Sequence, residues 1–134
     1  MNKLFFILYF SLSFSQVIPT HLLDKIDIDN IPKYIPYINT GESNILFNDY
    51  AYTENRESGI ISYLKINSSY DGNYQIKIKD ASFPKEAYLA FFDINQNTIY
   101  GPYTYLNGPL IFPSVMNSKE IIIIYFEPYN SEFE

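Results

Sequence analysis

A run of six consecutive apolar residues near the end of the chain constrains its fold more than any other feature. The run "IIIIYF" occupies Ile121–Phe126, and Glu120, Glu127 and Pro128 flank it. It is too short to span a bilayer, and it suits a β-strand. A strand without a polar face must be covered on both sides, because an exposed one would aggregate. We therefore predict that Glu120–Glu127 is a central strand, or that the N-terminal arm covers it.

Upstream of this run, apolar and polar residues alternate with a period of two, which indicates further strands with one solvated face. Gly and Asp-Gly signals separate them. We predict strands at Ile60–Ile66, Asn73–Lys79, Glu86–Asp93 and Thr98–Tyr100, a hairpin at Asp71-Gly72 and a turn over Asp93–Asn97. The stretch "IYGPYTYLNGP" is predicted to form a packed corner, because Gly101 permits a turn and Pro102 stiffens it. The period of two would place Tyr103 and Tyr105 on one face of this corner.

The N-terminal part of the chain has no such period. Pro19, Pro32 and Pro36 interrupt it, and each favours extended backbone. We predict an arm over residues 16–57 that lies on another surface, with an additional edge strand in Asn44–Tyr52. The fold class is all-β, a small antiparallel sandwich or jelly roll over residues 58–128, followed by a tail at 129–134.

The first residues have the pattern of a secretory signal peptide. Lys3 precedes an apolar run from Leu4 to Phe14, and Ser13 and Ser15 are small residues before a cleavage point. We predict a signal peptide over residues 1–15. No Cys follows for a lipid anchor, and no later run is long enough to span a membrane. The expected location is therefore secreted or periplasmic, with no membrane attachment after cleavage.

Composition excludes several classes of function. The 134 residues carry a net charge of −6 without a basic cluster, which argues against nucleic acid as a partner. Cys is absent, so there are no disulfides, thiolate metal sites or Cys nucleophiles. The single His, His21, lies in the arm, where no serine and carboxylate pattern accompanies it as a triad requires.

Oxygen-rich stretches do not make a convincing metal or glycosidase site. Asp24–Asn30 and Asp93–Asn97 lack the Gly and the distal Glu of a calcium loop, and turn chemistry explains them. The glutamates show no spacing that singles out a catalytic pair. Asn67-Ser68-Ser69 is formally a glycosylation sequon. We predict no enzyme activity, no cofactor and no bound metal.

A longer pattern resembles a known family. Phe83-Pro84-Lys85-Glu86-Ala87 is followed by Phe92-Asp93, by Gly101-Pro102-Tyr103-Thr104 and, at the end, by Glu127-Pro128. This order resembles the N-terminal, non-catalytic β region of bacterial secreted precursors of lysyl-endopeptidase-type, trypsin-like serine proteases. The resemblance covers more than half of the chain after the signal peptide. The matching positions are Pro84, Ala87, Asp93, Gly101, Pro102, Tyr103, Thr104, Asn107, Glu127 and Pro128.

Several positions depart from the family pattern. Glu86 replaces a turn glycine, which makes a positive φ costly there. Ser62-Tyr63 stands in place of a Trp-Arg pair, and Asn117-Ser118 in place of a Gly-Asp turn. The protease domain of the family would begin about where this sequence stops.

The resemblance implies a pro-region without its enzyme, which assists folding of a serine protease catalytic domain or shields it. In that case the matched positions are structural first and contact residues second. The alternative is an extracellular module that binds a glycan or a surface protein. Tyrosines buried between sheets favour the pro-region, whereas an exposed cluster of Tyr or Phe favours the binding module.

Overall fold

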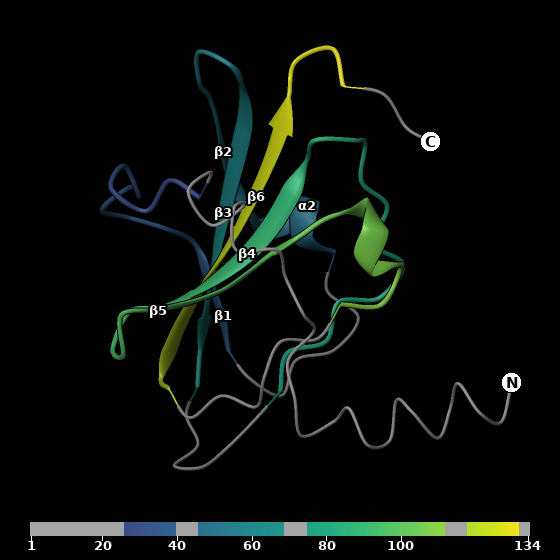
Figure 1. Cartoon of the computed structure of the whole chain (residues 1–134). Coiled ribbons are helices and arrows are strands. Elements are labelled where there is room, and N and C mark those ends of the chain that lie inside the picture. Colours follow the sequence, from purple (N-terminus) through teal and green to yellow (C-terminus); the bar gives the residue numbers. More distant parts are fainter. Residues whose placement is uncertain (1–25, 40–45, 69–74, 112–117, 132–134) are drawn as a thin grey trace, which may run out of the picture.

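Six strands form one mixed sheet in the computed structural model of the chain (Figure 1). The structure describes residues 26–39, 46–68, 75–111 and 118–131. A four-residue helix, α2, and a 3-10 turn, η2, complete the elements. The bounds are β1 Tyr37–Asn39, α2 Phe47–Tyr50, β2 Tyr52–Asn55, β3 Gly59–Asn67, β4 Tyr88–Asp93, β5 Thr98–Tyr103, η2 Tyr105–Asn107 and β6 Glu120–Pro128.

The strand order is β1-β3-β6-β4-β5. Strand β2 also pairs with β3, along the same edge as β1. The pairing of β1 with β3 is parallel, and every other pairing is antiparallel. The all-β class is therefore confirmed, but the sheet is mixed and not wholly antiparallel. Within the described ranges no second sheet faces the first, so the sandwich stays a prediction. The predicted signal peptide and His21 lie outside the described residues.

The final strand is central, as predicted. β6 lies between β3 and β4, and its register with β3 runs from Gly59 opposite Pro128 to Asn67 opposite Glu120. The four isoleucines from Ile121 to Ile124 are at most 4% exposed. Alternate residues point to opposite faces, so each face of the sheet receives two of them. The four isoleucines are buried because both faces of the sheet are covered, whereas Tyr125 and Phe126 at the end of the run are partly exposed.

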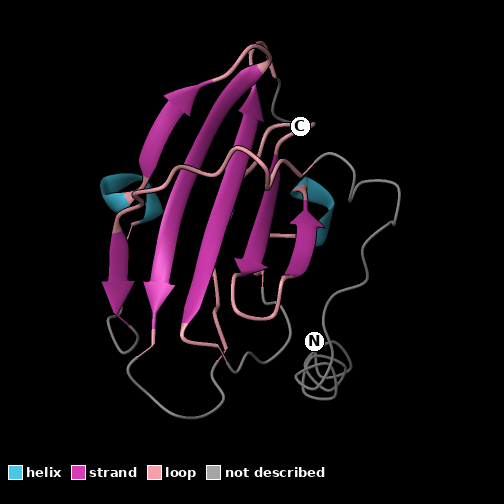
Figure 2. Cartoon of the chain, turned by 90° about the vertical axis from the view of Figure 1, so that its left-hand side faces the viewer, coloured by secondary structure: helices cyan, strands magenta, loops and turns pink. Residues whose placement is uncertain are grey.

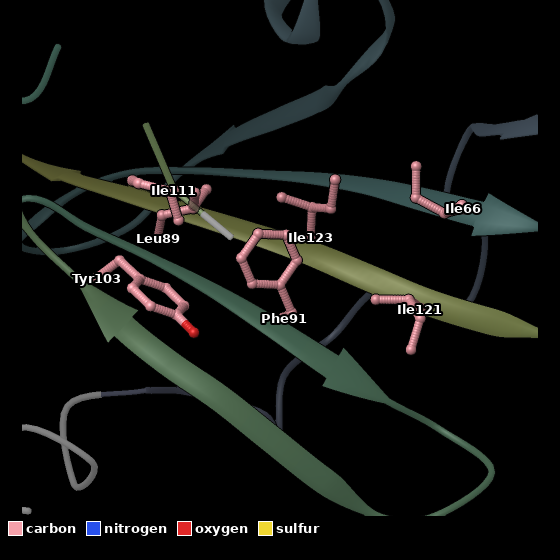
Figure 3. Close-up of a cluster of buried hydrophobic side chains, with 7 residues drawn as sticks. All are labelled: Ile66, Leu89, Phe91, Tyr103, Ile111, Ile121 and Ile123. Carbon is pink, nitrogen blue, oxygen red and sulfur yellow. The ribbon is translucent and has the colours of Figure 1, made fainter. Parts of the chain in front are cut away.

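One face, here called the first face, carries a cluster of seven buried residues (Figure 3). They are Ile66, Leu89, Phe91, Tyr103, Ile111, Ile121 and Ile123. Irregular segments cover this face, including Ile76, Ile78 and Phe83. The predicted strand Asn73–Lys79 is wrong for the described part, because only Ile78 makes a bridge, with Ile111. The predicted hairpin at Asp71-Gly72 lies outside the described residues.

The arm covers the opposite face, here called the second face. Ile26, Ile28, Ile31 and Ile35 pack against a cluster that contains Tyr63, Tyr88 and Ile124 from β3, β4 and β6. Figure 2 shows the segment that leads into β1 crossing the strands. None of residues 26–35 pairs with a strand in the described sheet, so side-chain packing and side-chain hydrogen bonds to its backbone hold this segment in place.

The sheet begins before residue 58. β1 and β2 both come from the segment predicted as an arm, and both pair with β3. The edge strand predicted over Asn44–Tyr52 is displaced: Phe47–Tyr50 is helical, and the strand occupies Tyr52–Asn55. None of the helices in the described part of the chain has the length and apolarity to cross a membrane.

Candidate interaction surface

The Gly101-Pro102 pair lies inside strand β5 and not in a turn, so the predicted corner is wrong at this point. Tyr100 pairs with Phe91 and Tyr103 with Leu89, which leaves two residues of β5 opposite Ala90. This is a β-bulge, which bends an edge strand and interrupts its pairing. Gly101 has φ of 122°, and the Gly101-Pro102 peptide bond is cis. Both residues are buried.

The two residues that follow have structural roles. The ring of Tyr103 is fully buried and lies edge-on to Phe91, with ring centroids 5.8 Å apart. Thr104 caps η2: its Oγ1 accepts a hydrogen bond from the Leu106 amide, and its own amide donates to Asn107 Oδ1 at 2.7 Å. The alternation stops after Tyr103, because Tyr105 already belongs to η2, so the prediction that Tyr103 and Tyr105 share a face fails.

The other positions that match the family pattern lie at or near the ends of strands. Pro84, Ala87 and Asp93 are buried, whereas Glu127 and Pro128 are partly exposed and end β6 beside Ile60 and Gly59. Register places Tyr103, Glu127 and the start of β4 at one end of the sheet, and Asp93 at the other. The matched positions therefore form no single exposed site. Glu86 has φ of 69°, so this turn uses a positive φ without the glycine, against expectation.

Both oxygen-rich stretches make turn contacts. Asp93 Oδ1 accepts the Gln96 amide at 3.0 Å, and Asp27 Oδ1 accepts the Asp29 and Asn30 amides at 3.2 and 3.3 Å. These are the local side-chain contacts by which Asp stabilises turns. In the described ranges, no three His, Cys, Asp or Glu side chains lie together as metal ligands would. Asp24 lies outside the described residues.

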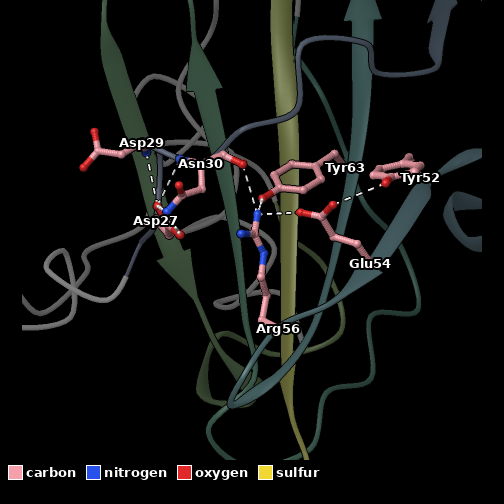
Figure 4. A network of polar contacts seen from close by, with 7 residues as sticks. All are labelled: Asp27, Asp29, Asn30, Tyr52, Glu54, Arg56 and Tyr63. Carbon is pink, nitrogen blue, oxygen red and sulfur yellow. Dashed lines mark hydrogen bonds and ion pairs between the residues drawn. The ribbon is translucent and has the colours of Figure 1, made fainter.

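Arg56, the one arginine of the sequence, makes polar contacts with three separate segments (Figure 4). Its Nη2 donates to the Asn30 carbonyl oxygen at 3.0 Å and to Tyr63 Oη at 2.8 Å, and it pairs with Glu54 Oε1 at 2.6 Å. Arg56 therefore joins the arm, strand β2 and strand β3. The sequence patterns did not point to Arg56. The only signal for it in the sequence is that the chain has a single arginine.

The network perturbs the ionisation of its members. Burial lowers the pKa of Arg56, but the hydrogen bond with Tyr63 and the nearby Glu54 carboxylate oppose this effect, and the pKa is raised. Burial raises the pKa of Tyr63, and the guanidinium partly opposes this. Burial also raises the pKa of Tyr88, against a hydrogen bond with the Asp27 backbone. All three groups therefore keep their protons at neutral pH, and the network acts structurally.

Exposed tyrosines occur in the segments that form β1, α2 and β2. We call the set Tyr34, Tyr37, Tyr50 and Tyr52 the tyrosine edge; the four residues are 81%, 59%, 51% and 42% exposed. Tyr37 begins β1 opposite Lys65, and Tyr52 begins β2 opposite Tyr63. Directly opposed residues share a face, so both rings belong to the second face, on the side where β1 and β2 border β3.

The tyrosine edge is the strongest candidate for a site. Tyr52 Oη donates to Glu54 Oε2 at 3.3 Å, and Lys33 Nζ lies 5.6 Å from the centroid of the Tyr34 ring. Leu46, 67% exposed, precedes α2. Tyrosine is enriched at protein interfaces, where its ring packs against the partner while its hydroxyl stays polar. With 14 tyrosines in the chain, composition alone could not single out these four.

Comparison with known proteins adds no assignment. No protein-family model matches the chain, and neither a curated protein nor a solved structure matches it. The functional argument therefore rests on the surface described above.

Proposed function

We propose that this chain is a secreted, non-catalytic β domain of the sandwich type that binds another protein through the tyrosine edge. The observation that carries the proposal is the set of four exposed tyrosines in the segments of β1, α2 and β2, two of which, Tyr37 and Tyr52, lie on the second face. Tyrosine supplies a large contact area with a polar tip at a low entropy cost, which suits it to protein interfaces.

Exposed tyrosines favour a protein-binding module over a pro-region, and the resemblance to protease pro-regions supplies one partner to test, a serine protease catalytic domain of the lysyl-endopeptidase type. In that family the matched Gly101-Pro102-Tyr103-Thr104 segment belongs to the β region itself. Here Tyr103 is fully buried, so recognition of the protease would use exposed residues and not this motif. The motif would instead stabilise the conformation of the edge strand β5.

Surface plasmon resonance with an immobilised lysyl-endopeptidase-type protease tests the proposal. The double variant Tyr37→Ala/Tyr52→Ala removes two exposed rings, and Leu106→Ala, which changes a 78% exposed residue in η2, is the matched control. We expect the wild type and the control to bind, and the double variant to bind at least tenfold more weakly. Equal binding by all three proteins, or none by any, would overturn the proposal.

A glycan array with the same three proteins tests the alternative, a glycan-binding module. Tyrosine faces also stack on sugars, so this alternative uses the same rings. Retention of a neutral glycan by the wild type but not by the double variant, with no binding to protease, would replace the proposed partner.

A further inference from the structure

The chemistry of the tyrosine edge indicates what kind of segment it receives, provided that the proposed binding function holds. We propose that it binds an extended, basic segment of the partner protein, with Lys or Arg side chains at alternate positions. Three features of the tyrosine edge favour such a ligand: the ring faces, the charge around them and the spacing between them.

The ring faces accept a cation within the structure itself. Lys33 Nζ lies 5.6 Å from the centroid of the Tyr34 ring, within the range of a cation–π contact. Tyr34 is the most exposed residue of the tyrosine edge, so an ammonium group is attracted there although water competes for it. Tyr37 and Tyr52, more than 40% exposed, offer the same ring chemistry to a cation from outside.

The surrounding charge is complementary to a basic ligand. Residues 26–39 and 46–57, together with Lys65 opposite Tyr37 on β3, carry five acidic side chains against three basic ones. The acidic residues are Asp27, Asp29, Asp49, Glu54 and Glu57. Of the three cations, Arg56 is paired with Glu54 and Lys33 stacks on Tyr34, whereas Lys65 lies beside Tyr37. Asp49 is exposed in the same short helix as Tyr50. The surface therefore attracts a cation and disfavours an acidic segment.

The spacing of the rings suits an extended ligand. Tyr37 lies opposite Lys65 and Tyr52 opposite Tyr63, two positions apart on β3. Their Cα atoms are therefore separated by about 7 Å along the sheet, at 3.3–3.4 Å per residue. Side chains at positions i and i+2 of an extended peptide have this same separation and point the same way. Lys or Arg at alternate positions would thus meet both rings.

Fluorescence anisotropy with labelled short peptides tests this inference on the whole chain. The probes are a peptide of alternating lysine and serine, and its counterpart of alternating glutamate and serine. The variants are Tyr37→Leu/Tyr52→Leu, which keeps apolar bulk but removes the ring faces, and Leu106→Ala as the control. Circular dichroism confirms that each variant is folded.

We expect the lysine peptide to bind the wild type and the control, and to bind the double leucine variant about 5- to 30-fold more weakly, as the loss of two exposed cation–π contacts requires. We expect the glutamate peptide not to bind. Equal binding of both peptides, or a lysine affinity unchanged in the double variant, would overturn the inference. Protease binding that depends on the rings, without peptide binding, would leave the proposed function intact and refute only this step.

Discussion

The bulge in β5 predicts a large penalty for Gly101→Ala. A φ of 122° strains any residue with a side chain by about 1–3 kcal/mol. A Cβ at this position would also lie 3.0 Å from the Leu89 carbonyl oxygen and 3.1 Å from the Ala90 Cα. These are backbone atoms of β4, which cannot move without disturbing the sheet, so overpacking adds about 1–3 kcal/mol. The two effects together take about 4 kcal/mol from a stability on the order of 5–15 kcal/mol.

Gly108→Ala is the matched control for this prediction. Gly108 also has a positive φ, 79°, but a Cβ there would have no atom within 4 Å. It therefore carries the backbone penalty alone. The difference of about 2 kcal/mol corresponds to about 7 °C in Tm for a chain of 134 residues. Thermal unfolding followed by circular dichroism measures both variants. Equal Tm values for Gly101→Ala and Gly108→Ala would refute the close-approach argument.

Three further predictions follow from the described contacts. Arg56→Ala should release the arm, because the Asn30 carbonyl and Tyr63 Oη both lose their donor; we expect about 1–3 kcal/mol of destabilisation and faster amide exchange in residues 26–35, and unchanged exchange would contradict the link. Thr104→Val should cost about 1 kcal/mol in urea unfolding by removing the η2 cap, and an unchanged midpoint would argue against it. Burial raises the pKa of Tyr103 and Tyr125 to about 12, above the unfolded value of about 10, so the folded chain retains protons that the unfolded chain releases. The free energy of unfolding should therefore hold steady below pH 10 and fall between pH 10 and 12; phenolate absorbance in which every tyrosine titrates near pH 10 would contradict this.

The sequence predicts the central strands well, because their pattern leaves few alternatives. The apolar run of β6 had to be covered on both faces. Strand β3 extends only one residue beyond its predicted bounds at each end. The wrong predictions concern which segments pair as strands in the sheet. Asn73–Lys79 alternates cleanly, and Ile76 and Ile78 do face the core while Lys77 and Lys79 are exposed, but only Ile78 finds a partner. The alternation of apolar and polar residues predicts which side of a segment is buried. It does not predict whether a neighbouring strand is present.

The tyrosine edge shows why the candidate site was not predicted. Tyr37 and Tyr52 come from different short strands, and only their pairing with β3 brings them to one border of the sheet. A parallel strand of three residues has no recognisable sequence signal. The matched Gly101-Pro102-Tyr103-Thr104 segment was conspicuous in the sequence, but three of its four residues are buried.

The position of β6 has a consequence for how the chain acquires its structure during synthesis. β3 and β4 do not pair with each other in the described sheet, and each pairs with β6, the last strand in the order of the chain. Until that strand leaves the ribosome, the two earlier strands lack the neighbour that joins them. Closing β3 onto β6 also brings together Gly59 and Pro128, across most of the sheet-forming sequence. Such distant pairings slow folding and prolong the exposure of apolar strands. The apolar faces of β3 and β4 therefore stay without their common neighbour until β6 is inserted between them.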